Sequence, residues 1–159
     1  MLNLQRKLRT FRLLSSDDRS LIVQVLSVSV AISCGFRVLG VARSQALLRR
    51  WATSGNGDRT HPPTQADISA VLRAQSIVRK SSIEGTCLVR SFTLWALLSK
   101  RGCNTDLRIG FRKGQNGQEG HAWVELKGVP LNETPEVVKT YCVCAEEVGF
   151  DTWRNDRRT

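Results

Sequence analysis

The chain has 159 residues, a length that fits one compact domain with at most a short appendage. Hydrophobic residues make up 41% and charged residues 24%, which excludes a mainly disordered chain, a collagen-like fibre and a multi-span membrane protein. Lysine and arginine (24) exceed aspartate and glutamate (14), so the net charge is +10. Most of this excess, +7, lies in residues 1–50, apart from the segments that we expect to carry chemistry.

Residues 20–36 form an uncharged run of 17 residues between Arg19 and Arg37. A membrane-spanning helix needs about 20 mainly apolar residues, and this run is shorter and contains Gln24 and several serines. A signal peptide would have a shorter basic region and a clean cleavage site. We therefore expect a buried or interfacial helix here.

Composition changes along the chain predict three parts. Residues 1–64 form a basic, helical N-terminal region and linker, residues 65–145 a catalytic core, and residues 146–159 a charged C-terminal tail. Gly35 and Gly40 should divide the proline-free residues 1–50 into two helices. The linker, residues 51–63, is dense in Gly, Ser, Asn and Pro, so we expect His61 to be a solvated loop residue.

Two more helices are predicted after the linker. Thr64 and Asp67 have the spacing of a helix cap and a first-turn carboxylate, and the apolar face that follows carries Ile68, Val71, Leu72 and Val78. The next helix should run from near Thr86 to Lys100, because cations followed by Gly102 are a typical stop signal. Its predicted buried stripe is Leu88, Phe92, Trp95 and Leu98.

After Gly102 the hydrophobic pattern changes to strict alternation, which predicts strands. Two strands are expected over 107–112 and 120–126, with a chain reversal at Asn116-Gly117. A turn at Lys127-Gly128 and further strands over 129–133 and 137–144 complete the prediction. Helices followed by antiparallel strands make the expected fold class α+β.

The five cysteines are odd in number and lack the spacing of a disulfide framework, which indicates a reducing, cytoplasmic setting; they are Cys34, Cys87, Cys103, Cys142 and Cys144. The C-x-C pair at 142 and 144 lacks the paired spacing of zinc sites. We therefore predict no metal and no cofactor.

Cys87 is the one cysteine predicted to lie in the first turn of a helix. Backbone N–H groups there have no intrahelical partner, and the positive end of the helix dipole favours a thiolate. The same groups, the N–H of Cys87 included, could hold an oxyanion when the thiolate attacks an acyl carbon. Position alone fits a nucleophile and an ordinary buried cysteine equally well, because cysteine is among the most commonly buried residues.

His121 and Glu133 are predicted to meet across the Lys127-Gly128 turn. Lysine is a poor first residue for a two-residue turn, so we expect a three-residue turn with a left-handed glycine, which pairs His121 with Glu133. Directly opposed residues have Cβ atoms about 4.5–5.5 Å apart, within hydrogen-bonding reach. With a two-residue turn Asn132 would take the place of Glu133, and Glu125 is a further candidate to orient the imidazole.

A cysteine at a helix start, followed by a histidine and a carboxylate on adjacent strands, is the order of papain- and transglutaminase-type acyl-transfer sites. The stretches T-C-L-V-R-S (86–91), L-R-I-G-F (107–111) and G-H-A-W-V-E-L-K-G-V-P-L-N-E (120–133) resemble the transglutaminase-like leader peptidases of lasso-peptide biosynthesis. That family has C-L-x-R, then H-A-W-V-E, then a carboxylate, usually Asp, at the end of the next strand. The resemblance covers about residues 65–134.

The resemblance implies a transglutaminase/papain-like core with its nucleophile at a helix N-terminus packed on an antiparallel sheet. It implies a protease with a Cys87, His121 and Glu133 triad, which removes the leader from a ribosomally made precursor peptide. A separate asparagine-synthetase-like lasso cyclase would then close the ring. Trp123 is expected to shield the imidazole, and Arg90 to be a solvated helix residue or an anchor for substrate or structure.

Some members of that family carry a winged-helix leader-recognition domain in the same chain. Residues 1–64 show no strand pairs to build one, so we expect a separate leader-recognition protein as a partner.

Two other functions fit parts of the sequence. An amine in place of water would make the same site a transglutaminase-like acyl transferase. A non-catalytic binding module would use the basic N-terminal helices, which could contact a membrane surface peripherally. Nucleic acid is not expected as a partner, because the basic residues there are not interleaved with aromatic residues.

Overall fold

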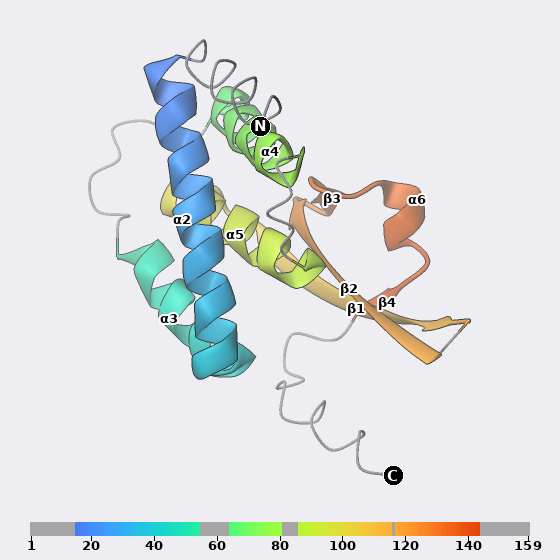
Figure 1. Cartoon of the computed structure of the whole chain (residues 1–159). Coiled ribbons are helices and arrows are strands. Elements are labelled where there is room, and N and C mark those ends of the chain that lie inside the picture. The colour runs from blue at the N-terminus through green and yellow to red at the C-terminus, as the bar shows by residue number, and fades with distance from the viewer. Residues whose placement is uncertain (1–14, 55–63, 81–85, 116, 144–159) are drawn as a thin grey trace, which may run out of the picture.

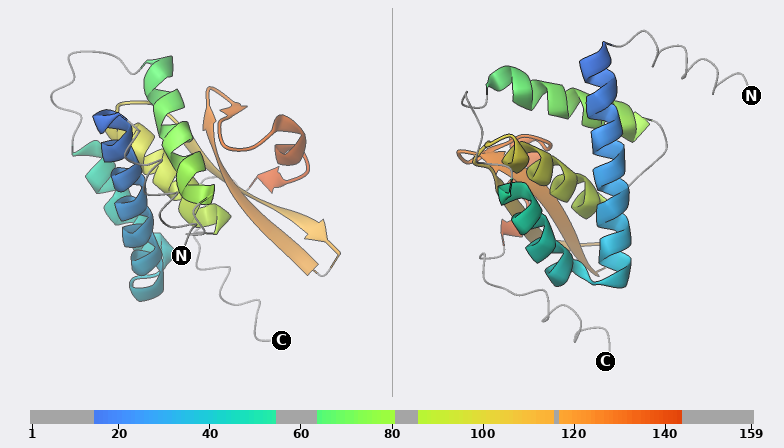
Figure 2. Two further views of the ribbon diagram at one scale, coloured as in Figure 1. Left: turned by 45° about the horizontal axis from the view of Figure 1, so that its top comes forward. Right: turned by 90° about the vertical axis from the view of Figure 1, so that its left-hand side faces the viewer.

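The computed structural model describes residues 15–54, 64–80, 86–115 and 117–143. Within them, long helices come first and an antiparallel sheet with one short helix follows. Figures 1 and 2 show the long helices on one side of the sheet and α6 on the other. This arrangement confirms the α+β class. The elements are α2 (Ser16–Val38), α3 (Val41–Thr53), α4 (Gln65–Lys80), α5 (Cys87–Lys100), β1 (Asp106–Gly114), β2 (Gly117–Leu126), β3 (Val129–Pro130), α6 (Pro135–Val138) and β4 (Cys142–Val143).

Gly40, but not Gly35, separates the two N-terminal helices. Gly40 has φ 78°, a left-handed conformation that glycine adopts readily, and it precedes the first residue of α3. Gly35 continues α2, and a Cβ there would lie 3.0 Å from the Ser44 hydroxyl, so this glycine lets α3 approach α2 closely. The predicted break at Gly35 was therefore wrong. The linker also begins later than predicted, because α3 runs through Thr53.

Helix α2 contains the uncharged run and is partly buried. Leu21, Ile22 and Val25 belong to one apolar core with residues of α4 and α5, whereas Val23 and Val30 are exposed. Within the described ranges, α2 is the one helix long and apolar enough to cross a membrane, with a mean hydropathy of 1.9, a test that core helices and signal sequences also pass. Contact of this region with a membrane stays a prediction, as does the domain division at residue 64.

The caps of α4 and α5 form as predicted. Thr64 Oγ1 accepts the Asp67 N–H at 3.3 Å, and the Asp67 carboxylate accepts the Thr64 N–H at 2.8 Å. Thr86 caps α5, and Gly102, with φ 78°, follows its end. Because α5 lies between the other helices and the sheet, its buried surface is wider than the predicted stripe. Leu88 and Trp95 are only half-buried, and the buried residues are Val89, Ser91, Phe92, Thr93, Leu94, Ala96, Leu97 and Leu98.

The sheet has the strand order β3-β2-β1-β4. β1 and β2 form a long antiparallel hairpin in which Gly110 lies opposite His121. Since successive side chains point to opposite faces of a strand, Ile109 and Val124 pack on the helices, while His121 and Trp123 lie on the other face.

The turn at Lys127-Gly128 has two residues, not the three that were predicted. Leu126 pairs with Val129, and both turn residues have positive φ, 51° at Lys127 and 78° at Gly128. These angles belong to a type I′ turn, in which the lysine is left-handed at a cost of about 1–2 kcal/mol. β3 ends at Pro130 instead of residue 133.

The strand predicted over residues 137–144 was wrong in its first half. Residues Pro135–Val138 form the helical turn α6, capped by Thr134, whose hydroxyl accepts the Val137 N–H at 3.4 Å. Proline at the first helical position with Glu136 in the first turn is a helix-start signal that the strand prediction overlooked. Strand pairing begins only at Cys142. His61, Cys144 and the predicted tail over 146–159 lie outside the described residues.

Candidate active site

Cys87 is the first residue of α5, as predicted. The Thr86 hydroxyl accepts the Val89 N–H at 3.4 Å, and the Thr86 carbonyl accepts the Arg90 N–H at 3.1 Å. The N–H groups of Cys87 and Leu88 therefore have no acceptor within the helix, and they lie at the positive end of its dipole. The Cys87 side chain is half-buried. This position suits a thiolate and the oxyanion that its attack on a carbonyl would create.

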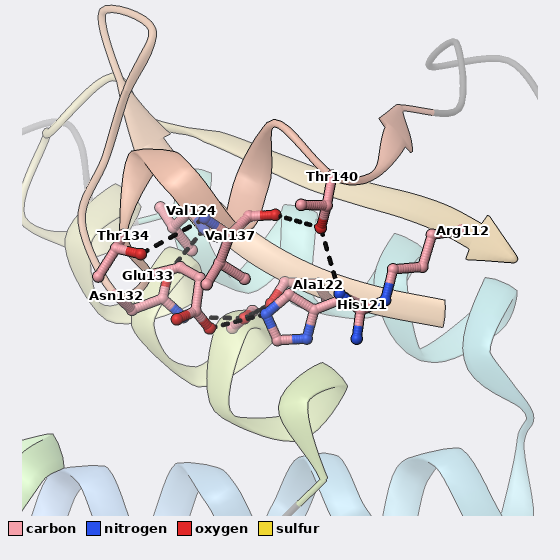
Figure 3. Close-up of polar contacts among 10 residues, drawn as sticks. Arg112, His121, Ala122, Val124, Asn132, Glu133, Thr134, Val137 and Thr140 are labelled. Carbon is pink, nitrogen blue, oxygen red and sulfur yellow. Dashed lines mark hydrogen bonds and ion pairs between the residues drawn. The ribbon is translucent and has the colours of Figure 1, made fainter. Parts of the chain in front are cut away.

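The predicted contact between His121 and Glu133 is present. The two atoms His121 Nε2 and Glu133 Oε2 are 2.7 Å apart, with 15% and 25% of the respective side chains exposed. Figure 3 shows the imidazole and the carboxylate facing each other. An ionised carboxylate only accepts hydrogen bonds, so opposite such a group a neutral imidazole would donate from Nε2–H and leave Nδ1 unprotonated. Nδ1 is then the nitrogen that can take a proton from a thiol.

Asn132 explains how Glu133 reaches His121 although the predicted register was wrong. The Leu131 N–H donates to the Val124 carbonyl at 2.8 Å, but the Val124 N–H donates to the Asn132 side chain at 2.8 Å instead of to a strand carbonyl. The side chain thus ends the ladder between β2 and β3. The chain leaves the sheet at this residue, so strand alternation no longer decides where Glu133 points.

A buried hydrogen-bond chain ties α5 to this same edge of β2. The Asn132 amide donates to Ser91 Oγ at 3.0 Å, and Ser91 Oγ donates to the Ala122 carbonyl at 2.8 Å. Ala122 is the neighbour of His121, and Cys87 lies one helical turn before Ser91, about 6 Å along the axis. Ser91 is therefore held against the β2 residue next to His121. Within the described residues, no hydrogen bond joins Cys87 to His121.

Glu125 and Trp123 lie on the face of His121, as predicted, and they contact each other. The Trp123 Nε1–H donates to Glu125 Oε1 at 2.8 Å, and Arg108 Nε donates to Glu125 Oε2 at 3.2 Å. Trp123 is fully buried, and its ring stacks with the imidazole at 6.2 Å between centroids. Glu133, and neither Glu125 nor Asn132, is the side chain that holds His121 in this structure.

Arg90 lies in the second turn of α5, and its carbonyl accepts the Gln75 amide at 2.7 Å, which ties α5 to α4. Among the described residues its guanidinium makes no hydrogen bond or ion pair, so its role as an anchor stays a prediction.

Tyr141 was not predicted as a site residue from the sequence, yet its ring centroid lies 5.2 Å from that of the His121 imidazole. The guanidinium of Arg112 lies 4.7 Å from the Tyr141 ring, and it also pairs with Glu119 at 2.8 Å. The hydrogen bond to Glu119 raises the pKa of Arg112 above its ordinary value. Gly110 is the residue that could have indicated this contact in the sequence, because a glycine within a strand often marks the close approach of another group.

Residues 27–146, most of the chain, match the family described as the transglutaminase-like superfamily. The match begins inside α2, so it takes in part of α2 and all of α3 as well as the segment that contains Cys87, His121 and Glu133. Comparison with curated proteins and with solved structures gave no match.

Proposed function

The chain belongs to the transglutaminase-like superfamily, and on that premise we propose that it is a cysteine protease that removes the leader peptide from a ribosomally made lasso-peptide precursor. Members of the superfamily generally have cysteine protease or acyltransferase activity. The observation that carries the proposal is the 2.7 Å contact between His121 and Glu133 on β2, the strand to which Ser91 ties α5. The choice of a lasso precursor as substrate rests on the resemblance of the stretches 86–91 and 120–133 to leader peptidases.

In the proposed reaction His121 Nδ1 takes the proton of the Cys87 thiol, and the thiolate attacks the scissile carbonyl carbon. The N–H of Cys87 donates to the oxyanion, and His121 returns the proton to the leaving amine as the C–N bond breaks. Water, deprotonated by His121, then hydrolyses the thioester and releases the leader as a carboxylate. Glu133 keeps the imidazole in the required tautomer and stabilises the imidazolium.

The proposed setting is cytoplasmic, with a separate leader-recognition protein that presents the precursor and a lasso cyclase that uses the product. An acyltransferase would share every step up to the thioester and would differ only in the acceptor, an amine instead of water.

Mass spectrometry of a lasso precursor incubated with the full chain tests the proposal. Wild type and Cys87→Ala would be compared with and without the recognition protein, and Cys34→Ala, an exposed cysteine on α2, serves as the matched control. We expect leader release by wild type and Cys34→Ala only, and faster release with the partner. Intact precursor in every folded sample would contradict the proposal and favour a binding module. A leader joined to an added amine would identify an acyltransferase.

A further inference from the structure

Three aromatic rings gather on the face of the sheet that carries His121. The centroids of Tyr141 and His121 are 5.2 Å apart with 29° between their planes, a stacked arrangement. The Trp123 ring lies 6.2 Å from each of the other two. None of the chemical steps proposed above uses Tyr141, although its ring lies nearer to the imidazole than that of Trp123.

Gly110 makes room for this cluster. It lies opposite His121 in the sheet, and a Cβ there would come within 2.9 Å of both the Trp123 ring and the Tyr141 Cβ. Such a distance is far inside van der Waals contact, so any other residue would push the rings away from the sheet. The glycine therefore permits the approach of Tyr141 to the imidazole.

The backbone and the ring of Tyr141 are both held in place. Its N–H donates to the Val138 carbonyl at 3.0 Å, and the next residue, Cys142, pairs with β1. Arg112, whose guanidinium contacts the ring, also donates to Thr140 Oγ1 at 3.3 Å, as Figure 3 shows. A ring fixed from several directions can fix a neighbour that stacks on it.

The hydrogen bond to Glu133 fixes the position of one nitrogen of His121, but a single hydrogen bond does not by itself define the plane of the ring. We propose that Tyr141 is a positioning residue: by stacking, its ring fixes the plane of the imidazole and so directs Nδ1 to the Cys87 thiol. This inference rests on the proposed Cys87 and His121 chemistry. A displacement of about 1 Å in a reacting group is enough to slow catalysis by up to about 10²-fold.

The chain has a single tyrosine and two histidines, so the contact can be observed directly by NMR. In the folded wild type we expect nuclear Overhauser effects between the ring protons of Tyr141 and those of one histidine, assigned to His121 by their loss in His121→Gln. Absence of these effects in the folded protein would overturn the inference without any variant of Tyr141.

Two substitutions separate the ring from the hydroxyl. Tyr141→Phe keeps the stacking ring, and we expect its kcat to stay within about twofold of wild type. Tyr141→Leu removes the ring, and we expect kcat to fall about tenfold while KM changes less than twofold. Trp51→Leu, which removes a half-exposed ring in contact with Lys100 on another part of the molecule, is the matched control and should have no effect.

An alkylation assay, which needs no peptide substrate, tests the role of Tyr141 independently of the proposed function. Site-resolved alkylation of Cys87 by iodoacetamide should slow in Tyr141→Leu but not in Tyr141→Phe, whichever peptide the enzyme cleaves. Equal rates in all three proteins, or equal slowing in the Phe and Leu variants, would overturn the positioning role even if precursor cleavage is found. If wild type fails to cleave the precursor but alkylation is slowed in the Leu variant alone, the proposed substrate is wrong and the positioning role of Tyr141 stands.

Discussion

The two halves of the candidate site are held in different ways. The helix–hairpin half, residues 86–126, supplies Cys87 and His121 from elements with buried cores, such as Phe92 and Trp123 at 0% exposure. The connecting half, residues 127–143, supplies Glu133 and Tyr141, and none of its side chains is buried. Apart from Leu131, which packs against the helix core, polar contacts hold this second half: the Asn132 bridge, the Thr134 cap and the pair of Glu133 with His121.

Because of this difference, substitutions can separate catalysis from stability. A substitution in the connecting half removes few apolar contacts, so it should change activity with little effect on unfolding. Asn132 is the exception, because it links that half to both β2 and α5.

His121→Gln should lower leader cleavage by about 10² to 10⁴-fold, because it removes the general base. Glu133→Gln should lower it by at least about tenfold, since the neutral amide can no longer stabilise the imidazolium. Steady-state cleavage rates measure both, and thermal unfolding should show folded proteins. Glu136→Gln, the same change at an exposed residue in α6, is the matched control. Cleavage by Glu133→Gln at the wild-type rate would remove Glu133 from the site.

Asn132→Ala should destabilise the fold by about 1–3 kcal/mol, because it leaves the N–H of buried Val124 without an acceptor. Urea unfolding followed by circular dichroism measures the change. Asn104→Ala, at an exposed position before β1, should change stability by less than about 0.5 kcal/mol. Equal effects of the two substitutions would show that Asn132 does not link the halves.

Lys127→Asn should stabilise the protein by about 0.5–1 kcal/mol, because asparagine tolerates the left-handed conformation that Lys127 adopts at φ 51°. The expected result is a higher urea midpoint with unchanged cleavage. Lys113→Asn, the same change at an exposed position in β1, should give no such gain. Destabilisation by Lys127→Asn would contradict a type I′ turn at this position.

Loss of the ion pair between Arg112 and Glu119 is expected to change stability least, since both side chains are exposed to solvent. Because the folded state raises the pKa of Arg112, the contribution of this group is present below its unfolded pKa and is lost only as pH rises through the folded pKa. Both values lie far above neutral pH, so Arg112 should add no pH dependence between about pH 6 and 9. Arg112→Met should therefore change the stability by the same amount at every pH between about 6 and 9. Thermal unfolding measured across this pH range tests this expectation.

The sequence predicted the helix–hairpin half well because its signals are long and local. The cap at Thr86, the stop at Gly102 and the alternation from Leu107 each extend over whole elements. The connecting half was harder, because β3 has two residues and α6 only four. Its course depends on the Asn132 side chain, which accepts the Val124 N–H in place of a backbone carbonyl. The two residues are 8 positions apart in sequence.

The same reasoning shows why the contact of His121 with Glu133 was found and that of Tyr141 was not. The first was predicted from a three-residue turn that does not form, and it is present because Asn132 ends the strand ladder and the chain then brings Glu133 to the imidazole. The second depends on a chain that leaves the sheet, turns through α6 and returns at β4 to the far side of β1. Sequence spacing gives no measure of such a path.

The most direct test of the account is to trap the acyl-enzyme. The precursor would be mixed with wild type, quenched in acid within the first turnover, and the protein digested and mapped by mass spectrometry. The account predicts the leader attached through a thioester to Cys87, with neither adduct nor cleavage in Cys87→Ala. Cleavage that persists in folded Cys87→Ala, or an adduct on a different residue, would contradict it.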